Sequence, residues 1–160
     1  IQGIDGQATE NEILRILEHY GILMHGGQVS VEIWGSGNPL REFLWSEEMA
    51  EACVFIMENV DFENLVKKDD EEPKKSKEIR NTHINIGTGK EISIKELAGL
   101  IARTIGFKGK LMYNKEKPDG TMRKLTDPSK LHELGWHHSI DVEEGVQKLY
   151  RWYTEKYKAK

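Results

Sequence analysis

The spacing of hydrophobic residues along this chain changes between a helical period and strict alternation, which predicts a mixture of helices and strands. Over residues 10–24, apolar side chains recur every three or four positions after Thr9, a good helix cap, so we expect an amphipathic helix there. Residues 29–34 alternate apolar and polar side chains, which predicts a half-buried strand. Residues 46–59 return to the helical period, and Ser46 is the cap that we expect for this second helix.

Glycines mark the end of the first predicted helix, at Gly21 and at the pair Gly26-Gly27. The apolar residues 22–24 lie between these stop signals, so the pattern leaves the last turn of the helix open. The second helix carries one apolar stripe that we expect to face the core, made of Met49, Cys53, Ile56 and Met57. Cys53 is therefore predicted to be a buried packing residue and not a reactive thiol.

The second half of the chain gives the same two kinds of signal. Residues 82–86 are predicted to form a buried strand, and residues 110–113 a second short strand. We expect a helix over residues 93–105, because Ser93 and Glu96 have the spacing of a capping box.

Two more helices complete the pattern. A short helix is predicted to start at residues 127–129, with proline in its first turn, and to end at Gly135. The last helix opens with Asp141 and Glu144, and its apolar positions are Val142, Val146, Leu149, Trp152 and Tyr153. These elements include too few strands for a complete doubly wound sheet. The sequence predicts an α/β fold of the α+β type, a small mixed sheet with flanking helices, in a single domain over residues 1–160.

Residues 67–78 are a run of mixed charge with no large apolar side chain. Such a segment gains too little from burial to offset its ordering entropy, so we expect a mobile, solvated loop. A docking site for a charged partner is the lesser alternative.

Composition narrows the function classes. Apolar residues make up 38% of the chain and charged residues 31%, as in soluble globular proteins, and the net charge of −4 argues against a general binder of nucleic acid or of a membrane surface. A single cysteine excludes an internal disulfide and fits a reducing compartment. We find no apolar stretch long enough to span a bilayer, and residues 1–3 do not begin a signal peptide, so we expect a cytoplasmic protein.

Trp34 and Arg41 flank a small-residue turn that follows the first predicted strand. An aromatic face and a planar guanidinium at this separation suit a base or sugar ring next to a phosphate, because the ring stacks while the guanidinium binds two oxygens. The alternative is that Trp34 only packs at the end of its strand.

Five segments in one order carry a resemblance to known enzymes: residues 34–44, 51–55, 83–91, 117–125 and 134–136. On these segments the chain resembles the GDP-L-fucose synthase family, NADPH-dependent epimerase-reductases of the extended short-chain dehydrogenase type. The likeness covers only the C-terminal, substrate-binding part of those enzymes, which orients GDP-4-keto-6-deoxymannose for epimerisation and reduction. It implies that residues 29–157 form a substrate lobe.

The same resemblance implies roles for three residues. Trp34 and Arg41 fall on family positions that hold the GDP-sugar, and Asp119 lies in the loop that closes over it, as an acceptor for ribose or sugar hydroxyls. Arg123 and Lys124 either add positive charge nearby or are ordinary solvated side chains.

The sequence lacks the motifs with which the family binds NADPH and carries out catalysis. A dinucleotide site needs a glycine-rich turn inside a long βαβ unit, whereas the pairs Gly35-x-Gly37 and Gly87-x-Gly89 lack the third glycine and are predicted to be turns. The family also uses a catalytic Ser with a Tyr-x-x-x-Lys pair. The only match, Tyr113 with Lys117, precedes Pro118 and should not lie on a helix. We therefore expect no NADPH site, no catalytic residue and no turnover from this chain alone.

A metal site is not expected either. His132, His137 and His138 cluster in the sequence, but no two of them have the helical spacing of zinc ligands, so we interpret the segment as a surface turn.

Residues 1–28 are atypical for the family, and a second function is possible there. The segment is either a divergent helix that covers the lobe or an engineered segment that binds another protein through helix-in-groove anchors. Those anchors would be Ile13, Ile16, Leu17, Tyr20, Leu23 and Met24, whose simpler role is packing on the core. The first hypothesis is thus a catalytically inactive lobe that binds GDP-sugar weakly, and the alternative is a protein-binding module on the same scaffold.

Overall fold

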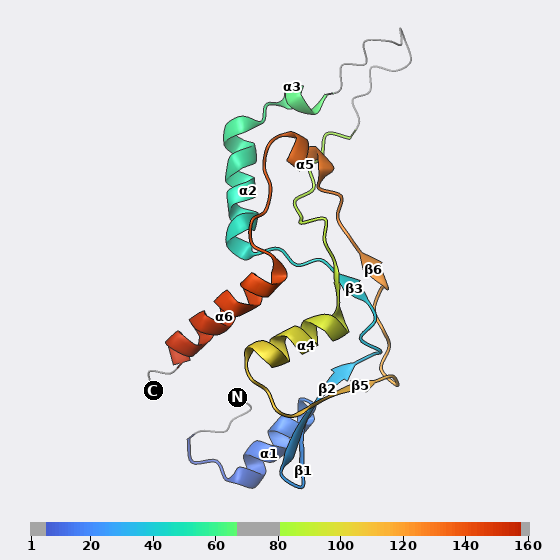
Figure 1. Cartoon of the computed structure of the whole chain (residues 1–160), viewed down its shortest axis with the longest axis vertical. Helices are drawn as coiled ribbons and strands as arrows, with labels where there is room; N and C mark the ends of the chain where they lie inside the picture. The colour runs from blue at the N-terminus through green and yellow to red at the C-terminus, as the bar shows by residue number, and fades with distance from the viewer. Residues whose placement is uncertain (1–5, 67–80, 158–160) are drawn as a thin grey trace. The chain divides into compact units, whose positions relative to one another are not determined.

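The structure is a computed structural model that describes residues 6–66 and 81–157. Figure 1 labels the helices and strands of these residues. The residues belong to two compact units. The first unit comprises Ile1–Arg41, Ile92–Lys124 and Val146–Lys160, and the second comprises Glu42–Glu91 and Leu125–Gly145. The predicted mobile loop at 67–78 lies outside the described residues.

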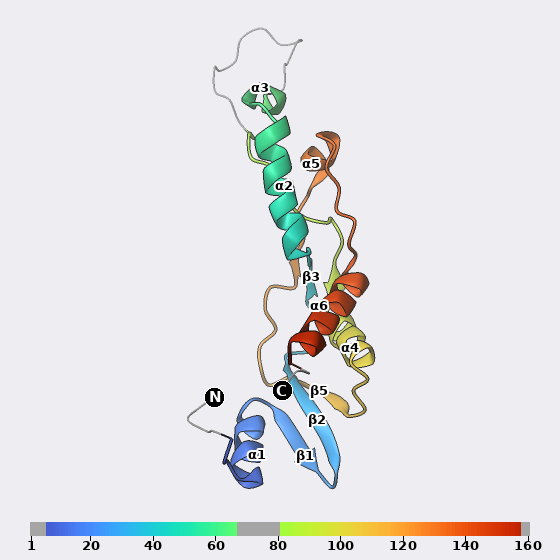
Figure 2. The ribbon, with the colours of Figure 1, turned by 90° about the vertical axis from the view of Figure 1, so that its left-hand side faces the viewer.

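Among the described residues, the strands of the first unit form two three-stranded sheets. In one, β2 (Gln28–Trp34) lies between β1 (Ile22–His25), to which it is antiparallel, and β5 (Lys110–Asn114), to which it is parallel. The β1–β2 hairpin lies beside helix α1 (Figure 2).

The second sheet is built from three two-residue strands. The central strand β3 (Leu40–Arg41) pairs antiparallel with β4 (Ile92–Ser93) and parallel with β6 (Arg123–Lys124). Both sheets are small and mixed, and helices accompany them, so the predicted fold class is confirmed.

The first helix, α1 (Glu10–His19), is shorter than the sequence pattern indicates. Its start is as predicted, because Thr9 and Glu12 form a capping box. The end of the helix, which the pattern left open, lies at His19, and residues 22–24 are not helical. Gly21 has a φ of 76°, which only glycine adopts easily, and the chain turns there into strand β1.

The first unit contains two longer helices that match their predictions. Helix α4 (Ile94–Thr104) begins at the predicted capping box of Ser93 and Glu96. Helix α6 (Val142–Tyr157) covers the last predicted segment, although its first residues belong to the second unit. None of the described helices is long and apolar enough to cross a membrane.

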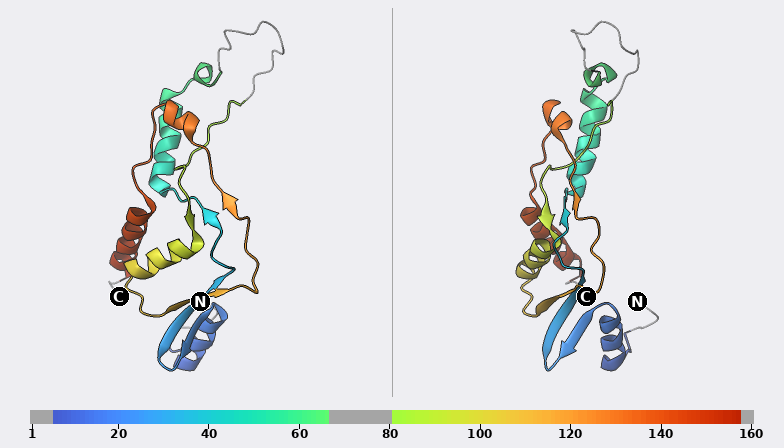
Figure 3. Two further views of the ribbon diagram at one scale, coloured as in Figure 1. Left: turned by 45° about the vertical axis from the view of Figure 1, so that its right-hand side comes forward. Right: turned by 90° about the vertical axis from the view of Figure 1, so that its right-hand side faces the viewer.

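The second unit is organised around helix α2 (Ser46–Asn59), with the short helices α3 (Phe62–Leu65) and α5 (Ser129–Glu133). Figure 3 shows α2 and α5 near one another in both views. Ala52, Leu131 and Trp136 form the buried core, against which further apolar side chains pack: Leu44, Phe55, Ile56, Ile84 and Ile86.

The core-facing stripe predicted for α2 is mostly wrong. Met57 is 84% exposed, and Met49 and Cys53 are also exposed, so Cys53 is not a buried packing residue. The helix instead buries Glu48 and Ala52. A pattern of apolar positions misses this face because its first member is a charged residue. The N-cap residue is Trp45 and not Ser46, and the Trp45 side chain makes no capping hydrogen bond.

Residues 82–86 do not form the predicted strand. Ile84 and Ile86 pack on the core, while polar groups hold the segment on its other side: the Asn85 amide donates to the carbonyl of Asp127 (3.1 Å) and the Lys130 ammonium donates to the carbonyl of His83 (2.9 Å). Alternating burial therefore arises here without strand pairing.

Candidate functional site

Trp34 ends strand β2 and is 70% exposed, so it does not serve mainly as a packing residue. The chain turns directly after it, with φ values of 82° at Gly35 and 76° at Gly37. A side chain at Gly35 would lie only 2.2 Å from Oδ1 of Asp119, and one at Gly37 would collide with the ring of Tyr113. Glycine at both positions lets the turn approach residues of a distant segment.

Asp119 belongs to that distant segment and binds the turn through two hydrogen bonds. Its Oδ1 accepts a hydrogen bond from the Ser36 backbone N–H (2.7 Å), and its Oδ2 accepts one from the Ser36 hydroxyl (2.6 Å). These two bonds favour the ionised carboxylate and lower the pKa of Asp119 below its usual value.

Arg41 makes a second link between the same two segments. Its Nη1 donates to the carbonyls of Leu40 (2.6 Å) and Thr121 (2.7 Å), and a side chain at Gly120 would lie 3.0 Å from its Nη2. The guanidinium is thereby held in one orientation.

We call residues 34–41 and 114–122 the loop pair. They are the connections from β2 to β3 and from β5 to β6, and they run in the same direction because β2 is parallel to β5 and β3 is parallel to β6 (Figure 3). The three residues singled out in the sequence, Trp34, Arg41 and Asp119, all lie in this loop pair. Arg123 and Lys124 follow it, exposed on β6.

Two residues of the loop pair were missed by the sequence analysis. Ser36 is the partner of Asp119, and the ammonium of Lys117 lies 5.3 Å from the centre of the Trp34 ring. The available signal was that Lys117 and Asp119 both lie in segment 117–125, which resembles the family. A contact between segments 83 positions apart has no local pattern.

As the sequence predicted, Tyr113 and Lys117 do not lie on one helix. Tyr113 lies in strand β5, where the ammonium of Lys95 is 6.0 Å from its ring centre, and burial raises its pKa. Lys117 instead follows the end of the strand in a turn, with its N–H bonded to the carbonyl of Asn114.

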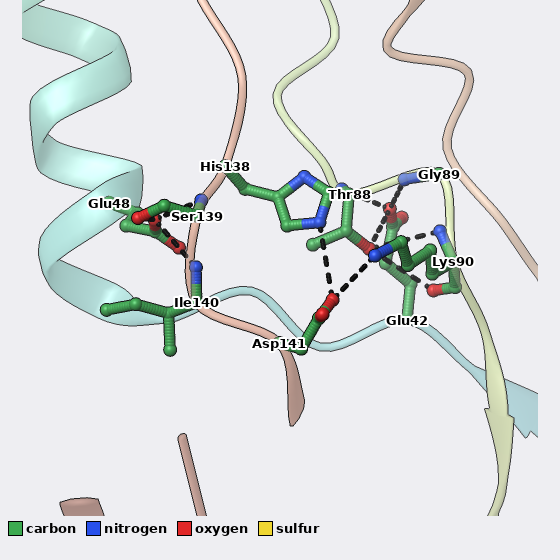
Figure 4. Close-up of polar contacts among 9 residues, drawn as sticks. All are labelled: Glu42, Glu48, Thr88, Gly89, Lys90, His138, Ser139, Ile140 and Asp141. Carbon is green, nitrogen blue, oxygen red and sulfur yellow. Dashed lines mark hydrogen bonds and ion pairs between the residues drawn. The ribbon is translucent and has the colours of Figure 1, made fainter. Parts of the chain in front are cut away.

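The second unit contains two carboxylates that accept several hydrogen bonds (Figure 4). Oε1 of Glu42 accepts from the backbone N–H groups of Thr88 (2.6 Å) and Gly89 (2.7 Å), and its Oε2 accepts from that of Thr126 (3.0 Å). Burial raises the pKa of Glu42, but the bonds from Thr126, Gly89 and Thr88 outweigh it, and the net pKa is lowered.

Glu48 plays a similar part at the start of α2. Its Oε1 accepts from the N–H (2.6 Å) and hydroxyl (2.7 Å) of Ser139 and from the N–H of Ile140 (3.1 Å). Burial raises the pKa of Glu48, but these hydrogen bonds outweigh that effect, so the net pKa is lowered. Beside it, Asp141 accepts from the Lys90 ammonium (2.6 Å) and lies 3.7 Å from Nε2 of His138 (Figure 4).

Neither glycine pair fits the pyrophosphate of a dinucleotide. The N–H groups of Thr88 and Gly89, which a phosphate would need, already bind the Glu42 carboxylate, whose charge would repel an anion. The open side of Gly35 is filled by the Asp119 carboxylate. We therefore derive no chemistry through NADPH from these residues.

The histidine cluster is compact but has no metal geometry. The rings of His132 and His137 stack with centroids 4.4 Å apart, and burial, with the neighbouring histidines, lowers the pKa of His132. Among residues 6–66 and 81–157, no three His, Cys, Asp or Glu side chains are grouped to hold a metal ion. His132 also lines a pocket of about 440 Å³ in the second unit, which contains none of the residues predicted to bind substrate.

Comparison with known proteins identifies the family of this chain. The model of the NAD dependent epimerase/dehydratase family matches residues 6–87. The chain belongs to this family. The match begins at residue 6 and so includes helix α1 and the β1–β2 hairpin, the part of the chain that the sequence analysis found atypical.

Sequence relatives of this chain include GDP-L-fucose synthases. The enzyme of Escherichia coli (strain K12) is 43% identical over 125 residues, which are 78% of this chain and 36% of that protein. GDP-L-fucose synthase 1 of Arabidopsis thaliana is 41% identical over 129 residues, 81% of this chain and 34% of that protein. The chain spans about a third of the length of these curated relatives.

Solved structures of similar proteins give the same picture. A GDP-6-OMe-4-keto-L-xylo-heptose reductase from C. jejuni superimposes with a TM-score of 0.79 at 40% identity, over 93% of this chain and 39% of that one. MlghC, a GDP-mannoheptose C4 reductase from Campylobacter jejuni with NADP bound, gives a TM-score of 0.72 at 39% identity, over 92% and 38%. The resemblance stated from the sequence is confirmed.

Proposed function

We propose that this chain is the GDP-sugar-binding part of an epimerase or reductase, and that the loop pair is its binding surface. The observation that carries the proposal is the loop pair itself. An exposed indole, an oriented guanidinium and an ionised carboxylate lie on two segments far apart in sequence. Hydrogen bonds from Ser36 to Asp119 and from Arg41 to the Thr121 carbonyl join these segments. The names of the relatives, which specify GDP-linked sugars, support the ligand class.

Each residue has a role that its environment allows. Trp34 offers a flat, solvent-exposed face on which a base or sugar ring stacks. Arg41 is held by two carbonyls at Nη1, so its guanidinium can meet the diphosphate without further ordering of the side chain. Asp119 holds the loop pair through Ser36, and the remaining lone pairs of its oxygens accept ligand hydroxyls.

We further propose that the chain alone does not turn over a GDP-sugar. Its glycine pairs are occupied by its own carboxylates, so hydride transfer needs parts that these residues do not supply. A coupled assay of NADPH oxidation with a GDP-4-keto sugar should stay at the background rate. Turnover above background would refute this part of the proposal.

The binding proposal is tested by amide NMR titration with GDP and GDP-mannose. We expect millimolar affinity and shifts concentrated at Trp34, Arg41 and Asp119. Arg41→Lys should weaken binding about tenfold, because a point charge replaces a bidentate fork. Trp34→Leu should abolish detectable binding. Trp152→Leu is its control, because Trp152 is 52% exposed against 70% for Trp34 and lies on α6, outside the loop pair. Equal loss in the control, or no shifts at the loop pair, would refute the proposal.

Protein binding through α1 is the second candidate, and one observation favours it. No residue of α1 is buried, and Ile13 and Tyr20 are 43% and 58% exposed. The anchor set predicted from the sequence needs a correction, because Leu23 and Met24 lie in strand β1 and do not continue the helical face. Ile16→Asp should abolish partner capture while leaving GDP binding intact if this candidate is right.

A further inference from the structure

The position of Lys117 is fixed by anchors on both sides of a short loop. On one side, Trp34 and Asn114 are paired in the β2–β5 register, and Asn114 accepts hydrogen bonds from the N–H groups of Gly35 (2.9 Å) and Lys117 (3.1 Å). On the other side, Asp119 is bound to Ser36. The loop between these anchors must therefore pass beside Trp34.

Lys117 uses this position to cover the indole. Its ammonium lies 5.3 Å from the centre of the Trp34 ring, within the range of a cation–π contact. The surface on which a ring would stack is thus already in contact with a cation.

We propose that the Lys117 side chain occupies the face of the Trp34 indole until a ring of the GDP-sugar displaces it. The displaced ammonium then binds the diphosphate of the same ligand. This inference rests on the proposed function of the loop pair. The exchange is favourable in two ways. A cation–π contact at an exposed site is weak, so its loss is easily offset, and the flexible lysine stem carries its charge from an aromatic face to an anion.

The proposal gives opposite predictions for two ligands. Guanosine has a ring and no phosphate, so it competes with Lys117 and gains nothing from it. GDP competes in the same way but receives the ammonium on its diphosphate. In Lys117→Met, guanosine should therefore bind about two- to fivefold more tightly, the factor that corresponds to an exposed cation–π contact. GDP should bind about three- to tenfold more weakly, since one charged contact is lost.

Lys115→Met is the control, because it removes the same charge from the same loop and Lys115 makes no cation–π contact with Trp34. It should leave the guanosine affinity unchanged. A parallel change in both ligands for Lys117→Met, or the same guanosine gain in Lys115→Met, would overturn the proposal.

A measurement without ligand separates this inference from the proposed function. The ring current of Trp34 should shift the Hε protons of Lys117 upfield in the free chain, and Trp34→Leu should remove that shift. If the shift is absent, Lys117 does not occupy the ring and the inference fails even where GDP binds. If the shift is present but neither ligand binds, the proposed function fails and the displacement fails with it.

Discussion

Glu48 in the second unit and Asp119 in the first unit accept the same pair of hydrogen bonds, one from a serine backbone N–H and one from the hydroxyl of that serine. Their surroundings differ. Glu48 is 4% exposed and adds a third bond from Ile140, whereas Asp119 is exposed in a loop next to Trp34. One hydrogen-bond pattern therefore serves two purposes.

The comparison shows how burial decides what a carboxylate does. A buried carboxylate that loses its donors cannot replace them with water, so Glu48 ties residues 139–140 to helix α2. An exposed carboxylate exchanges donors with water at little cost, so Asp119 shapes a surface that stays open to a ligand. We expect changes in the second unit to affect folding, and changes in the loop pair to affect binding.

The largest effect is expected in the core of the second unit. Leu131 is fully buried, so Leu131→Ala removes its packing and leaves a cavity among Ala52, Trp136 and their neighbours. The free energy of unfolding should fall by about 2 to 5 kcal/mol. Urea unfolding followed through the Trp136 indole N–H resonance measures it. Leu149→Ala is the control, since Leu149 is 55% exposed on α6, and an equal loss there would contradict the assigned core.

Glu48→Ala should have the next largest effect. It leaves three donors of Ser139 and Ile140 without their acceptor, which should lower the free energy of unfolding by about 2 to 3 kcal/mol. Glu48→Gln keeps an acceptor oxygen at the same place and should lose less. The same urea experiment checks both variants, and equal losses would mean that the charge and not the acceptor matters.

Acid should remove part of the Glu48 contribution. The pKa of Glu48 is lower in the folded chain than its ordinary value of 4.5, so its stabilisation is complete above pH 4.5 and is lost as the pH falls through the folded pKa. The difference between the natural chain and Glu48→Ala should therefore be largest near pH 7 and shrink toward pH 3. Urea midpoints at pH 7, 5 and 3 measure it, and a pH-independent difference would contradict the role of the ionised form.

How far the sequence predicts this molecule depends on the range of each interaction. Capping boxes and glycine stops are local, so the starts of α1 and α4 follow from Thr9 and Ser93. The β1 strand was missed because residues 22–24 continue an apolar pattern, and only their pairing with residues 29–31 decides their conformation. Glu48 was missed because a charged side chain at a core position is explained only by donors 91 and 92 residues away.

The candidate site residues come from a different kind of inference than the core residues. Trp34, Arg41 and Asp119 were named largely by resemblance to a family, and the structure brings them into the loop pair. Their partners Ser36 and Lys117 could not be found in the same way, because each contact joins segments about 83 positions apart.

The smallest effect on folding is expected at Trp34. Because its side chain is 70% exposed and ends a strand, Trp34→Leu should change the free energy of unfolding by less than about 0.5 kcal/mol. The same variant should lose GDP binding in the amide NMR titration, since the stacking face is gone. The GDP affinity of Asp119→Asn should lie between those of the unchanged chain and Trp34→Leu. Asparagine retains an acceptor for Ser36, so the turn stays formed, and binding weakens without being lost. If Trp34→Leu destabilised the chain as much as Leu131→Ala, the indole would belong to a core, and the contrast between a folding unit and a binding surface would fail.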